Sequence, residues 1–184
     1  MRLFVALSLP DAVAQSLMLI QGGVPGARWQ AREQLHLTLR FIGDVEGRDA
    51  GMLDAALAGI LAPGFSLQLH GVGQFGNKLP HALWAGVRPN AALEHLQRKV
   101  DNAIRRVGQP QDAHKFAPHV TLARLRNPDQ SRMLDWLTYN ALYTSPEFPV
   151  GAFHLYSSRL TSDGSLYRIE QDYELEGSHG ETDD

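Results

Sequence analysis

The sequence predicts an α+β protein built from a duplicated unit, with mostly antiparallel sheets and helices on their outer faces. Short segments rich in Leu, Val and Phe, typical of strands, alternate along the chain with segments of helical hydrophobic periodicity. The pattern His-x-Thr-Leu occurs twice, at His36 and at His119, 83 positions apart (119 − 36). A repeat of this kind in a chain of 184 residues indicates two similar halves.

Two further landmarks come after the two patterns at equal distances. Phe65 lies 29 positions after the first histidine and Phe148 lies 29 positions after the second, and each begins a strand-like segment. Trp84 and Tyr167 each lie 48 positions after their histidine. The shared register predicts halves that are related by an approximate two-fold axis.

Length and composition bound the domain organisation. With 184 residues, 43% of them hydrophobic, the chain can bury a proper core, so we assign residues 1–175 to a single two-lobed domain. Residues 170–184 hold seven acidic and no basic residues, and the rest of the chain has 17 basic against 13 acidic residues. A mildly basic body suits a ligand that bears phosphate, although a solvated surface gives the same balance. We expect the acidic residues 176–184 to form a disordered tail.

The first half begins with a strand at residues 2–9, a segment rich in Leu, Phe and Val. A helix then starts at the Pro-Asp pair and covers residues 10–20, because two glycines soon afterwards end its apolar periodicity. The strand with the first His-x-Thr-Leu pattern comes next, at residues 35–42.

The rest of the first half contains one helix and two strands. The helix covers residues 47–61 and is stopped by the Pro-Gly pair after it. The strands cover residues 65–75 and 81–87.

The second half repeats this order. An amphipathic helix covers residues 91–108, and the strand with the second His-x-Thr-Leu pattern covers residues 119–125. A helix at 128–140 and two strands at 149–160 and 165–175 complete the chain. The order predicts one sheet system that is covered by helices.

The repeated pattern has a defined geometry on a strand. Side chains two positions apart point to the same face, so His36 and Thr38 share one face, as do His119 and Thr121. The alternate positions take the opposite face, towards the helices and the core: Leu37, Leu39, Val120 and Leu122. A two-fold axis lets the two His-Thr faces meet across a cleft. A lone histidine on a strand is usually structural, but a symmetric pair with a threonine at the same offset favours catalysis.

Two imidazoles and two hydroxyls in one cleft fit attack at phosphorus. One histidine can act as the base that activates the nucleophile, and the other as the acid that protonates the leaving oxygen. The hydroxyls can donate hydrogen bonds to the non-bridging phosphoryl oxygens.

Other chemistries fit the sequence poorly. The chain has no cysteine, so disulfides and thiolate chemistry are excluded. Zinc needs three or four converging ligands, and neither motif contains Asp or Glu, so we expect no metal and no cofactor. The sequence lacks a GxxxxGK[ST] phosphate loop and a nucleophile elbow for Ser-His-Asp chemistry.

The sequence also bears on location. No apolar run approaches the length of a membrane span. The apolar start of the chain is interrupted early by Asp11 and is typical of a first strand rather than of a signal peptide. We therefore expect a cytoplasmic protein without membrane partners, and a monomer.

The paired motifs, the segments PHVTLAR and RLFVALSLP, and the spacing of about 80 residues resemble the 2H phosphoesterase superfamily. Within it, the chain is most similar to the bacterial and archaeal RNA 2′,3′-cyclic phosphodiesterases, historically called 2′–5′ RNA ligases. The resemblance covers about residues 2–175. It implies a two-lobed fold with the site between the lobes. It also implies hydrolysis of a 2′,3′-cyclic phosphate, on RNA ends or nucleotides, to a 2′-phosphate without a metal.

The resemblance also implies roles for individual residues. His36 matches the proton donor of the family and His119 matches the proton acceptor. Thr38 and Thr121 match the phosphate-binding threonines, and Arg124 matches a basic residue that the family often places near the phosphate.

The arginine assignment leaves an alternative open. By strand alternation Arg124 has the parity of Leu122, which faces the core, whereas Arg40 has the parity of His36 and Thr38. Either the second strand bends after Leu122, or Arg40 supplies the positive charge.

The remaining candidates are weaker. His114 and Lys115 lie in a loop before the second motif and can contact a phosphate, but a solvated loop is the better explanation of the pair. Four aromatic residues can stack on a base, although core packing is the simpler explanation of each: Phe41, Phe75, Trp84 and Tyr167. The other histidines are read as structural or surface residues: His70, His81, His95, His154 and His179.

Three functions remain open at the level of sequence. The first is the cyclic phosphodiesterase. The second is a sister activity of the same fold, such as cleavage or ligation of 2′–5′ linkages or hydrolysis of ADP-ribose cyclic phosphate. The third is an RNA-binding module with little turnover, which the intact histidines and threonines of both motifs argue against.

Overall fold

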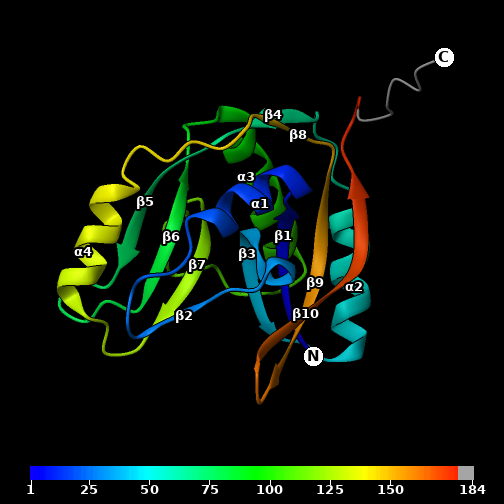
Figure 1. Ribbon diagram of the computed structural model, residues 1–184. Helices are drawn as coiled ribbons and strands as arrows, with labels where there is room; N and C mark the ends of the chain where they lie inside the picture. Colours follow the sequence, from blue (N-terminus) through cyan, green and yellow to red (C-terminus); the bar gives the residue numbers. More distant parts are fainter. Residues whose placement is uncertain (178–184) are drawn as a thin grey trace.

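Residues 1–177 are described by a computed structural model (Figure 1). The α+β class and the antiparallel pairing predicted from the sequence are confirmed. The elements in chain order are β1 (Arg2–Ser8), α1 (Asp11–Leu19), β2 (Ala27–Trp29), the 3₁₀ helix η1 (Arg32–Gln34), β3 (His36–Asp44), α2 (Gly47–Ala58), β4 (Phe65–Leu67), β5 (Leu69–Phe75), β6 (Ala82–Val87), α3 (Ala91–Arg106), β7 (His119–Leu125), α4 (Gln130–Tyr139), β8 (Phe148–Val150), β9 (Ala152–Thr161) and β10 (Gly164–Glu174).

The strands differ from the sequence prediction in three places. The segments 65–75 and 149–160, each predicted as one strand, are both broken, and their first parts, β4 and β8, pair in a separate two-stranded sheet. The short strand β2, which the sequence analysis missed, pairs with β7. Gly26, which has φ +88°, precedes β2, and a Cβ there would lie 2.7 Å from the Arg126 carbonyl oxygen. Glycine therefore permits the close approach that brings β2 onto β7.

The main sheet has the strand order β10-β9-β1-β3-β7-β6-β5, with β2 added beside β7, and every pairing in it is antiparallel. The centre of this sheet is its weakest seam, because β3 and β7 meet at the single pair Leu37↔Val120. The sheet therefore divides there into two lobes. We call β10-β9-β1-β3 the first lobe and β2-β7-β6-β5 the second lobe.

The two halves of the sequence are interleaved in these lobes. β6, which the sequence analysis placed at the end of the first half, pairs with β7 and so begins the second half in the structure. β5 comes from the first half but pairs with β6 in the second lobe, and β9 comes from the second half but pairs with β1 in the first lobe. β1 and β6 thus occupy matching places, each between a motif strand and an exchanged strand. The predicted landmark Trp84–Tyr167 does not mark matching places, because β6 lies inside the sheet and β10 lies at its edge.

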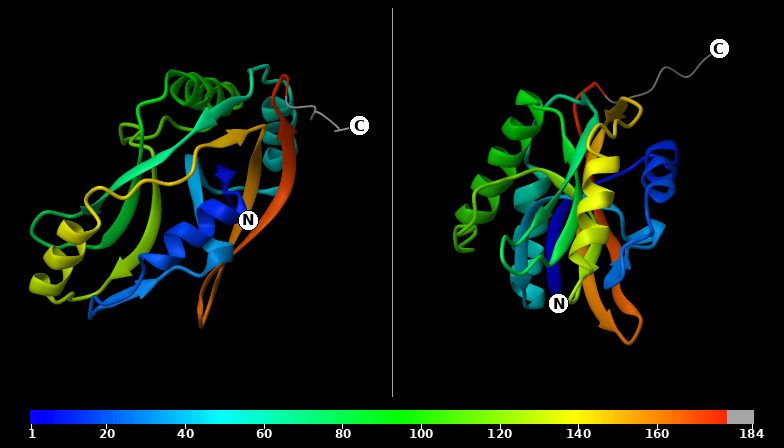
Figure 2. Two further views of the ribbon diagram at one scale, coloured as in Figure 1. Left: turned by 45° about the horizontal axis from the view of Figure 1, so that its top comes forward. Right: turned by 60° about the vertical axis from the view of Figure 1, so that its left-hand side comes forward.

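The α-helices lie in two pairs, one pair on each side of the main sheet. Figure 2 (right) shows α2 and α3 on one side of the sheet and α1 and α4 on the other. α3 packs on β3, whereas the indole Nε1 of Trp136 in α4 donates to the carbonyl of Ile20 at the end of α1. The alternate residues of both motif strands are fully buried against these helices: Leu37, Leu39, Val120 and Leu122.

This packing fixes the orientation of the motif strands. Burying a Leu or Val side chain stabilises the fold by roughly 1.5–3 kcal/mol, and a slip of one residue would exchange the core and cleft faces. The histidines and threonines are therefore held on the opposite face, away from the helices.

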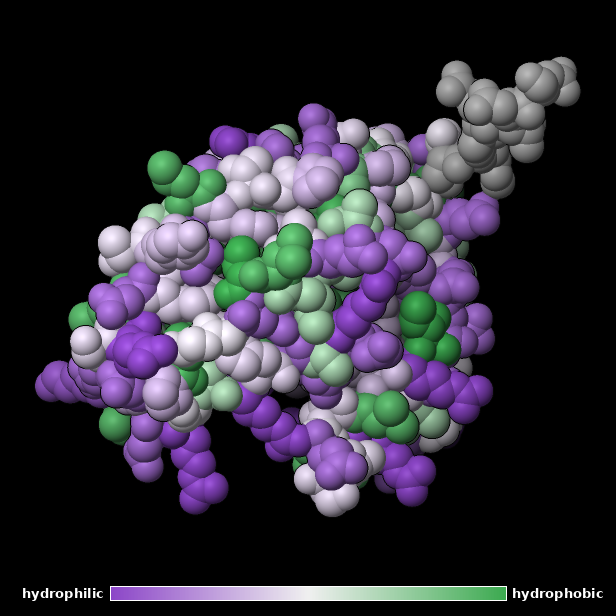
Figure 3. All heavy atoms as spheres, in the orientation of Figure 1, coloured by the Kyte–Doolittle hydropathy of each residue, from purple (hydrophilic) through white to green (hydrophobic). Residues whose placement is uncertain are grey.

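The surface and the chain end complete the description. On the face in Figure 3, hydrophobic side chains are separated by hydrophilic ones. Among the described residues, no helix has both the length and the apolar character needed to span a bilayer.

The backbone of Glu176 bonds to Ala62 and Gly64, so the chain is held as far as this residue. The rest of the predicted acidic tail, residues 178–184, lies outside the described residues.

Candidate active site between the two lobes

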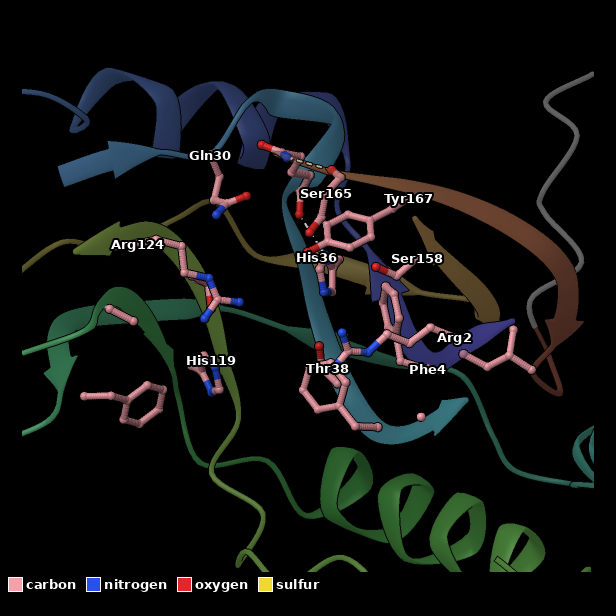
Figure 4. A pocket seen from close by; sticks show the side chains of 17 residues that line it. Arg2, Phe4, Gln30, His36, Thr38, His119, Arg124, Ser158, Ser165 and Tyr167 are labelled. Atoms are coloured by element: carbon pink, nitrogen blue, oxygen red, sulfur yellow. Dashed lines mark hydrogen bonds between the residues drawn. The ribbon is translucent and has the colours of Figure 1, made fainter. Parts of the chain in front are cut away.

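A pocket of about 510 Å³ lies between the lobes and brings the two motifs together. His36 and Thr38 line it from β3, and His119 and Thr121 line it from β7. Figure 4 shows both imidazoles and the guanidinium of Arg124 around this cavity. The cleft that the repeat predicted thus places the two His-Thr pairs on facing strands.

Both histidines are held by the same backbone contact. His36 Nδ1 is 2.7 Å from the carbonyl oxygen of Gln34, and His119 Nδ1 is 2.7 Å from the carbonyl oxygen of Ala117. A carbonyl oxygen can only accept, so Nδ1 carries the hydrogen in each ring. Nε2 is then the nitrogen that can take up or release a proton in the pocket. The arrangement gives two imidazoles with the same tautomer, either of which can act as acid or base.

Matching β-bulges come after the two threonines. In β3 the register against β1 shifts between Thr38 and Arg40, and in β7 the register against β6 shifts between Thr121 and Ala123. A bulge adds one residue and reverses the side-chain alternation beyond it. The bulge in β7 therefore turns Arg124 into the pocket, which it lines.

The bulge in β3 turns Arg40 away from the pocket. Its side chain is only 6% exposed, and its Nε donates to Asp101 Oδ1 at 2.6 Å. Its other guanidinium nitrogens donate to the carbonyls of Phe41 and Pro110. Arg40 therefore belongs to a buried ion pair, and of the two arginines left open by the sequence it is Arg124 that reaches the pocket.

The pocket is cationic. Arg2 and Arg124 line it, and among the described residues no aspartate or glutamate does. Figure 4 shows the Arg2 side chain reaching into the cavity on the side of Thr38. A cationic, carboxylate-free pocket attracts phosphate and other anions.

Burial lowers the pKa of both histidines. Desolvation is the largest cause for His36 and lowers its pKa to about 4, with smaller contributions in the same direction from His119 and Arg124. Desolvation and Arg124 also lower the pKa of His119. In each ring the carbonyl acceptor at Nδ1 opposes the shift, because it stabilises the charged form. Both imidazoles therefore favour the neutral form, His36 more strongly.

Each histidine contacts an aromatic ring edge to face. Tyr167 lies 5.0 Å from His36 at 80°, and Phe75 lies 4.7 Å from His119 at 84°. Both aromatic residues line the pocket, as does Phe41, which is 59% exposed. Trp84, the fourth candidate for base stacking, does not line the pocket, and its buried Nε1 has no hydrogen-bond partner among the described residues.

Several polar residues that line the pocket were missed in the sequence: Arg2, Gln30, Gln34, Ser158 and Ser165. One signal could have found part of this set. Ser158 and Phe75 are 83 positions apart, the spacing of the two motifs, and both line the pocket. Gln30 lies in a connection with no distinctive pattern.

The remaining sequence candidates lie elsewhere. His114 and Lys115 are exposed and do not line the pocket. His70 bonds to Thr144, and His154 contacts Ser8 and Asp172. His179 is outside the described residues. Within residues 1–177, no group of three or more His, Asp or Glu side chains is placed to hold a metal ion.

The two-lobed fold and the facing His-Thr pairs define a protein of the two-histidine phosphoesterase class. The family model of the 2′-5′ RNA ligase superfamily matches residues 9–161, and the chain belongs to this family.

Individual relatives agree with this assignment. The chain is 37% identical over 128 residues to an RNA 2′,3′-cyclic phosphodiesterase of Geobacillus stearothermophilus, a match that covers 66% of this chain and 41% of that protein. It is 33% identical over 192 residues to the RNA 2′,3′-cyclic phosphodiesterase of Thermus thermophilus, covering 98% and 93% of the two chains. Escherichia coli LigT complexed with 3′-AMP superposes with a TM-score of 0.78 at 26% identity, over 95% of this chain and 98% of that one.

Proposed function

We propose that this chain hydrolyses 2′,3′-cyclic phosphates on RNA ends or nucleotides to 2′-phosphates by two-histidine acid–base catalysis. The observation that carries the proposal is the facing pair of imidazoles with identical Nδ1 contacts in a cationic pocket. The names of the curated relatives support the substrate class, and the 3′-AMP complex of LigT shows that a related protein accepts a nucleotide.

The pocket residues have separable roles in this reaction. His119 Nε2 accepts a proton from the attacking water as the new P–O bond forms. His36 Nε2 donates a proton to the ribose 3′-oxygen as its bond to phosphorus breaks, which leaves the phosphate on the 2′-oxygen. Thr38 and Thr121 donate hydrogen bonds to the non-bridging oxygens, and Arg124 stabilises their charge.

Family resemblance and the pKa of His36 favour opposite assignments of the acid and the base. Family resemblance gives His36 the acid role, whereas its deeper burial favours the neutral form of its imidazole. A phosphate monoanion in the pocket raises the pKa of both imidazoles, because it lies between them and favours the charged form. We keep His36 as the acid in the substrate complex.

The test is to incubate the protein with 2′,3′-cyclic nucleotides in EDTA and to identify the products by phosphorus NMR. We expect nucleoside 2′-phosphates without an added metal. A 2′–5′-linked dinucleotide and ADP-ribose cyclic phosphate, offered in parallel, test the sister activities. Faster turnover of either one than of the cyclic nucleotides, or activity that needs zinc or magnesium, would contradict the proposal. Binding of RNA without turnover of any substrate would indicate the binding module instead.

His95→Ala provides the matched control for these assays. His95 is exposed on α3 and lies outside the pocket. Replacing it removes a histidine without touching the proposed site, so this variant should keep normal activity. The cytoplasmic location and the monomeric state inferred from the sequence stay proposals, which cell fractionation and light scattering would test.

A further inference from the structure

A second group of reactive side chains lies outside the pocket between the lobes, which we call the phosphate pocket because of its proposed function. Ser8 at the end of β1, His154 on β9 and Asp172 on β10 come from three neighbouring strands, which Figure 1 shows side by side. Ser8 Oγ is 3.1 Å from His154 Nε2, and His154 Nδ1 is 2.6 Å from Asp172 Oδ1. None of the three lines the phosphate pocket.

The order of contacts defines the proton positions. A carboxylate only accepts, so His154 Nδ1 carries the hydrogen that bonds to Asp172. Nε2 is then free to accept from the Ser8 hydroxyl. This is the arrangement in which an oriented imidazole removes the proton of a serine nucleophile. The histidine side chain is 12% exposed, so the sheet holds its ring in place.

A second pocket, of about 400 Å³, opens beside these residues. Ser8, His154 and Glu174 line it together with small and apolar residues: Leu9, Pro10, Pro149, Val150, Gly151 and Ala152. The volume suits a small ligand. Among the described residues no Lys or Arg lines this pocket and one carboxylate, Glu174, does, in contrast to the first pocket, which two arginines line. A neutral ligand therefore suits the second pocket better than an anion.

The group exists in one lobe only. The position 83 residues before His154 is Gly71, and the residue opposite His119, which matches Ser8 opposite His36, is Gly86. The second lobe therefore has no counterpart of either side chain. The duplication that explains the phosphate pocket does not explain this group.

We propose that Ser8, His154 and Asp172 form a second, serine-based site that hydrolyses small neutral carboxylic esters. Ser8 Oγ attacks the acyl carbon while its proton passes to His154 Nε2. The alcohol leaves with that proton, and an acyl-Ser8 ester remains. Water then attacks the ester, gives one proton to His154 and releases the carboxylic acid, and the proton returns to Ser8. Pro10, which lines the pocket, is the N-cap of α1, so this helix begins at the edge of the pocket.

The experiment uses the full chain with both His36→Ala and His119→Ala, which removes the proposed chemistry of the first pocket. The protein is treated with a fluorophosphonate probe and, separately, with p-nitrophenyl acetate. We expect the probe to attach to Ser8, located by peptide mass spectrometry, and ester hydrolysis to be lost in Ser8→Ala. His154→Gln should slow both reactions by ~10²-fold or more. Asp172→Asn should slow them less, because this carboxylate is 67% exposed and screened by water.

Two controls keep the test decisive. Ser66→Ala removes an exposed serine on another strand and should change neither reaction. Ser8→Ala in the otherwise unchanged chain should retain cyclic phosphodiesterase activity, which shows that the sheet is intact. Probe attachment elsewhere than Ser8, or ester hydrolysis that survives Ser8→Ala, would overturn the proposal. Either result would leave the phosphodiesterase proposal untouched.

Discussion

The two motif strands, β3 and β7, carry the same reactive groups but differ in the residues beyond them. Each presents a histidine held through Nδ1 by the carbonyl two residues earlier, then a threonine, then a bulge. After the bulge the first lobe places Phe41 in the pocket, and the second lobe places Arg124 at the matching position. The residue before each is buried, as Arg40 in the first lobe and Ala123 in the second.

This difference teaches how a symmetric site can bind an asymmetric substrate. The shared residues supply two equivalent imidazoles and two equivalent hydroxyls. Arg124 places positive charge on β7 itself, whereas the matching position on β3 holds Phe41 and the positive charge on that side comes from Arg2 of the neighbouring strand β1. In the proposed reaction, this unequal placing of Arg124 and Phe41 would hold a phosphate ester in one orientation and so give the two histidines different roles.

The largest expected effect separates these roles. His36→Ala and His119→Ala should each slow hydrolysis of a 2′,3′-cyclic nucleotide by ~10²–10⁴-fold, because one removes the acid and the other removes the base. A nitrophenolate leaves without a proton, whereas attack by water needs a base with any ester. On a nitrophenyl phosphodiester that the unmodified chain accepts, His36→Ala should therefore recover much of its relative rate and His119→Ala should not.

The outcome also decides whether the role of His36 follows the family resemblance or the pKa that its burial lowers. Selective recovery of His119→Ala would reverse the two roles and agree with the low pKa of His36. Equal recovery of both variants would mean that orientation by Arg124 and Phe41 does not distinguish the histidines.

The next largest effect tests whether the two threonines have equivalent roles. Thr38→Val and Thr121→Val remove one hydroxyl each and keep the branched shape of the side chain, so the strands should persist. Losing one hydrogen-bond donor to a developing oxyanion costs ~10²-fold or more in rate. We expect similar losses of kcat in the two variants. Near-normal kcat/KM in both would show that the threonines do not bind the phosphoryl oxygens.

A smaller effect on activity distinguishes the two arginines. Arg124→Gln removes a charged donor from the pocket and should raise KM roughly 10- to 100-fold, in line with ~1.5–3 kcal/mol for a hydrogen bond to a charged group. Arg40→Gln should leave KM unchanged and lower the free energy of unfolding by ~3 kcal/mol, because Asp101 loses its buried partner. Kinetics and urea denaturation on both variants measure the two quantities. A raised KM in Arg40→Gln with normal stability would contradict the assignment.

The smallest effect is on stability against pH. Both histidines have a lower pKa in the folded chain than in the unfolded chain, so the unfolded chain binds more protons as the pH falls below 6.5. The contribution of His36 is present above about pH 6.5 and is lost as the pH falls towards 4, and the contribution of His119 is lost in the same direction. The denaturation midpoint of His36→Gln should therefore fall less between about pH 7 and pH 4.5 than that of the unmodified chain. His119→Gln should flatten the dependence to a smaller degree, and an equally steep dependence in His36→Gln would contradict the burial of this ring.

Sequence reasoning reached the site through local patterns. The alternation within His-x-Thr-Leu placed leucines in the core and His36 with Thr38 on the opposite face, because strand parity is a local property. Parity failed at Arg124 because a bulge reverses it, and no residue of that segment signals a bulge. The sequence left Arg2 unassigned because its place beside Thr38 depends on how β1 and β3 pair.

The fold shows the same division between local and long-range information. Helices and strands were predicted from periodicity and from turn residues. The exchange of β5 and β9 between the lobes was not, because pairing across the sheet depends on contacts far apart in the chain. The same reason hid Ser8, His154 and Asp172, which are separated by 146 and 18 positions and meet only when β1, β9 and β10 align.

The strand exchange also bears on how the protein folds. β5 completes the lobe built on β7, and β9 completes the lobe built on β3, so neither half of the chain encodes a finished sheet. A fragment ending after β6 would lack its exchanged neighbour and expose the edge of β1. The halves should therefore gain their structure in one cooperative transition rather than as two independent folding units. Partial unfolding that spares one histidine and releases the other is disfavoured, and both reactive groups appear or vanish together.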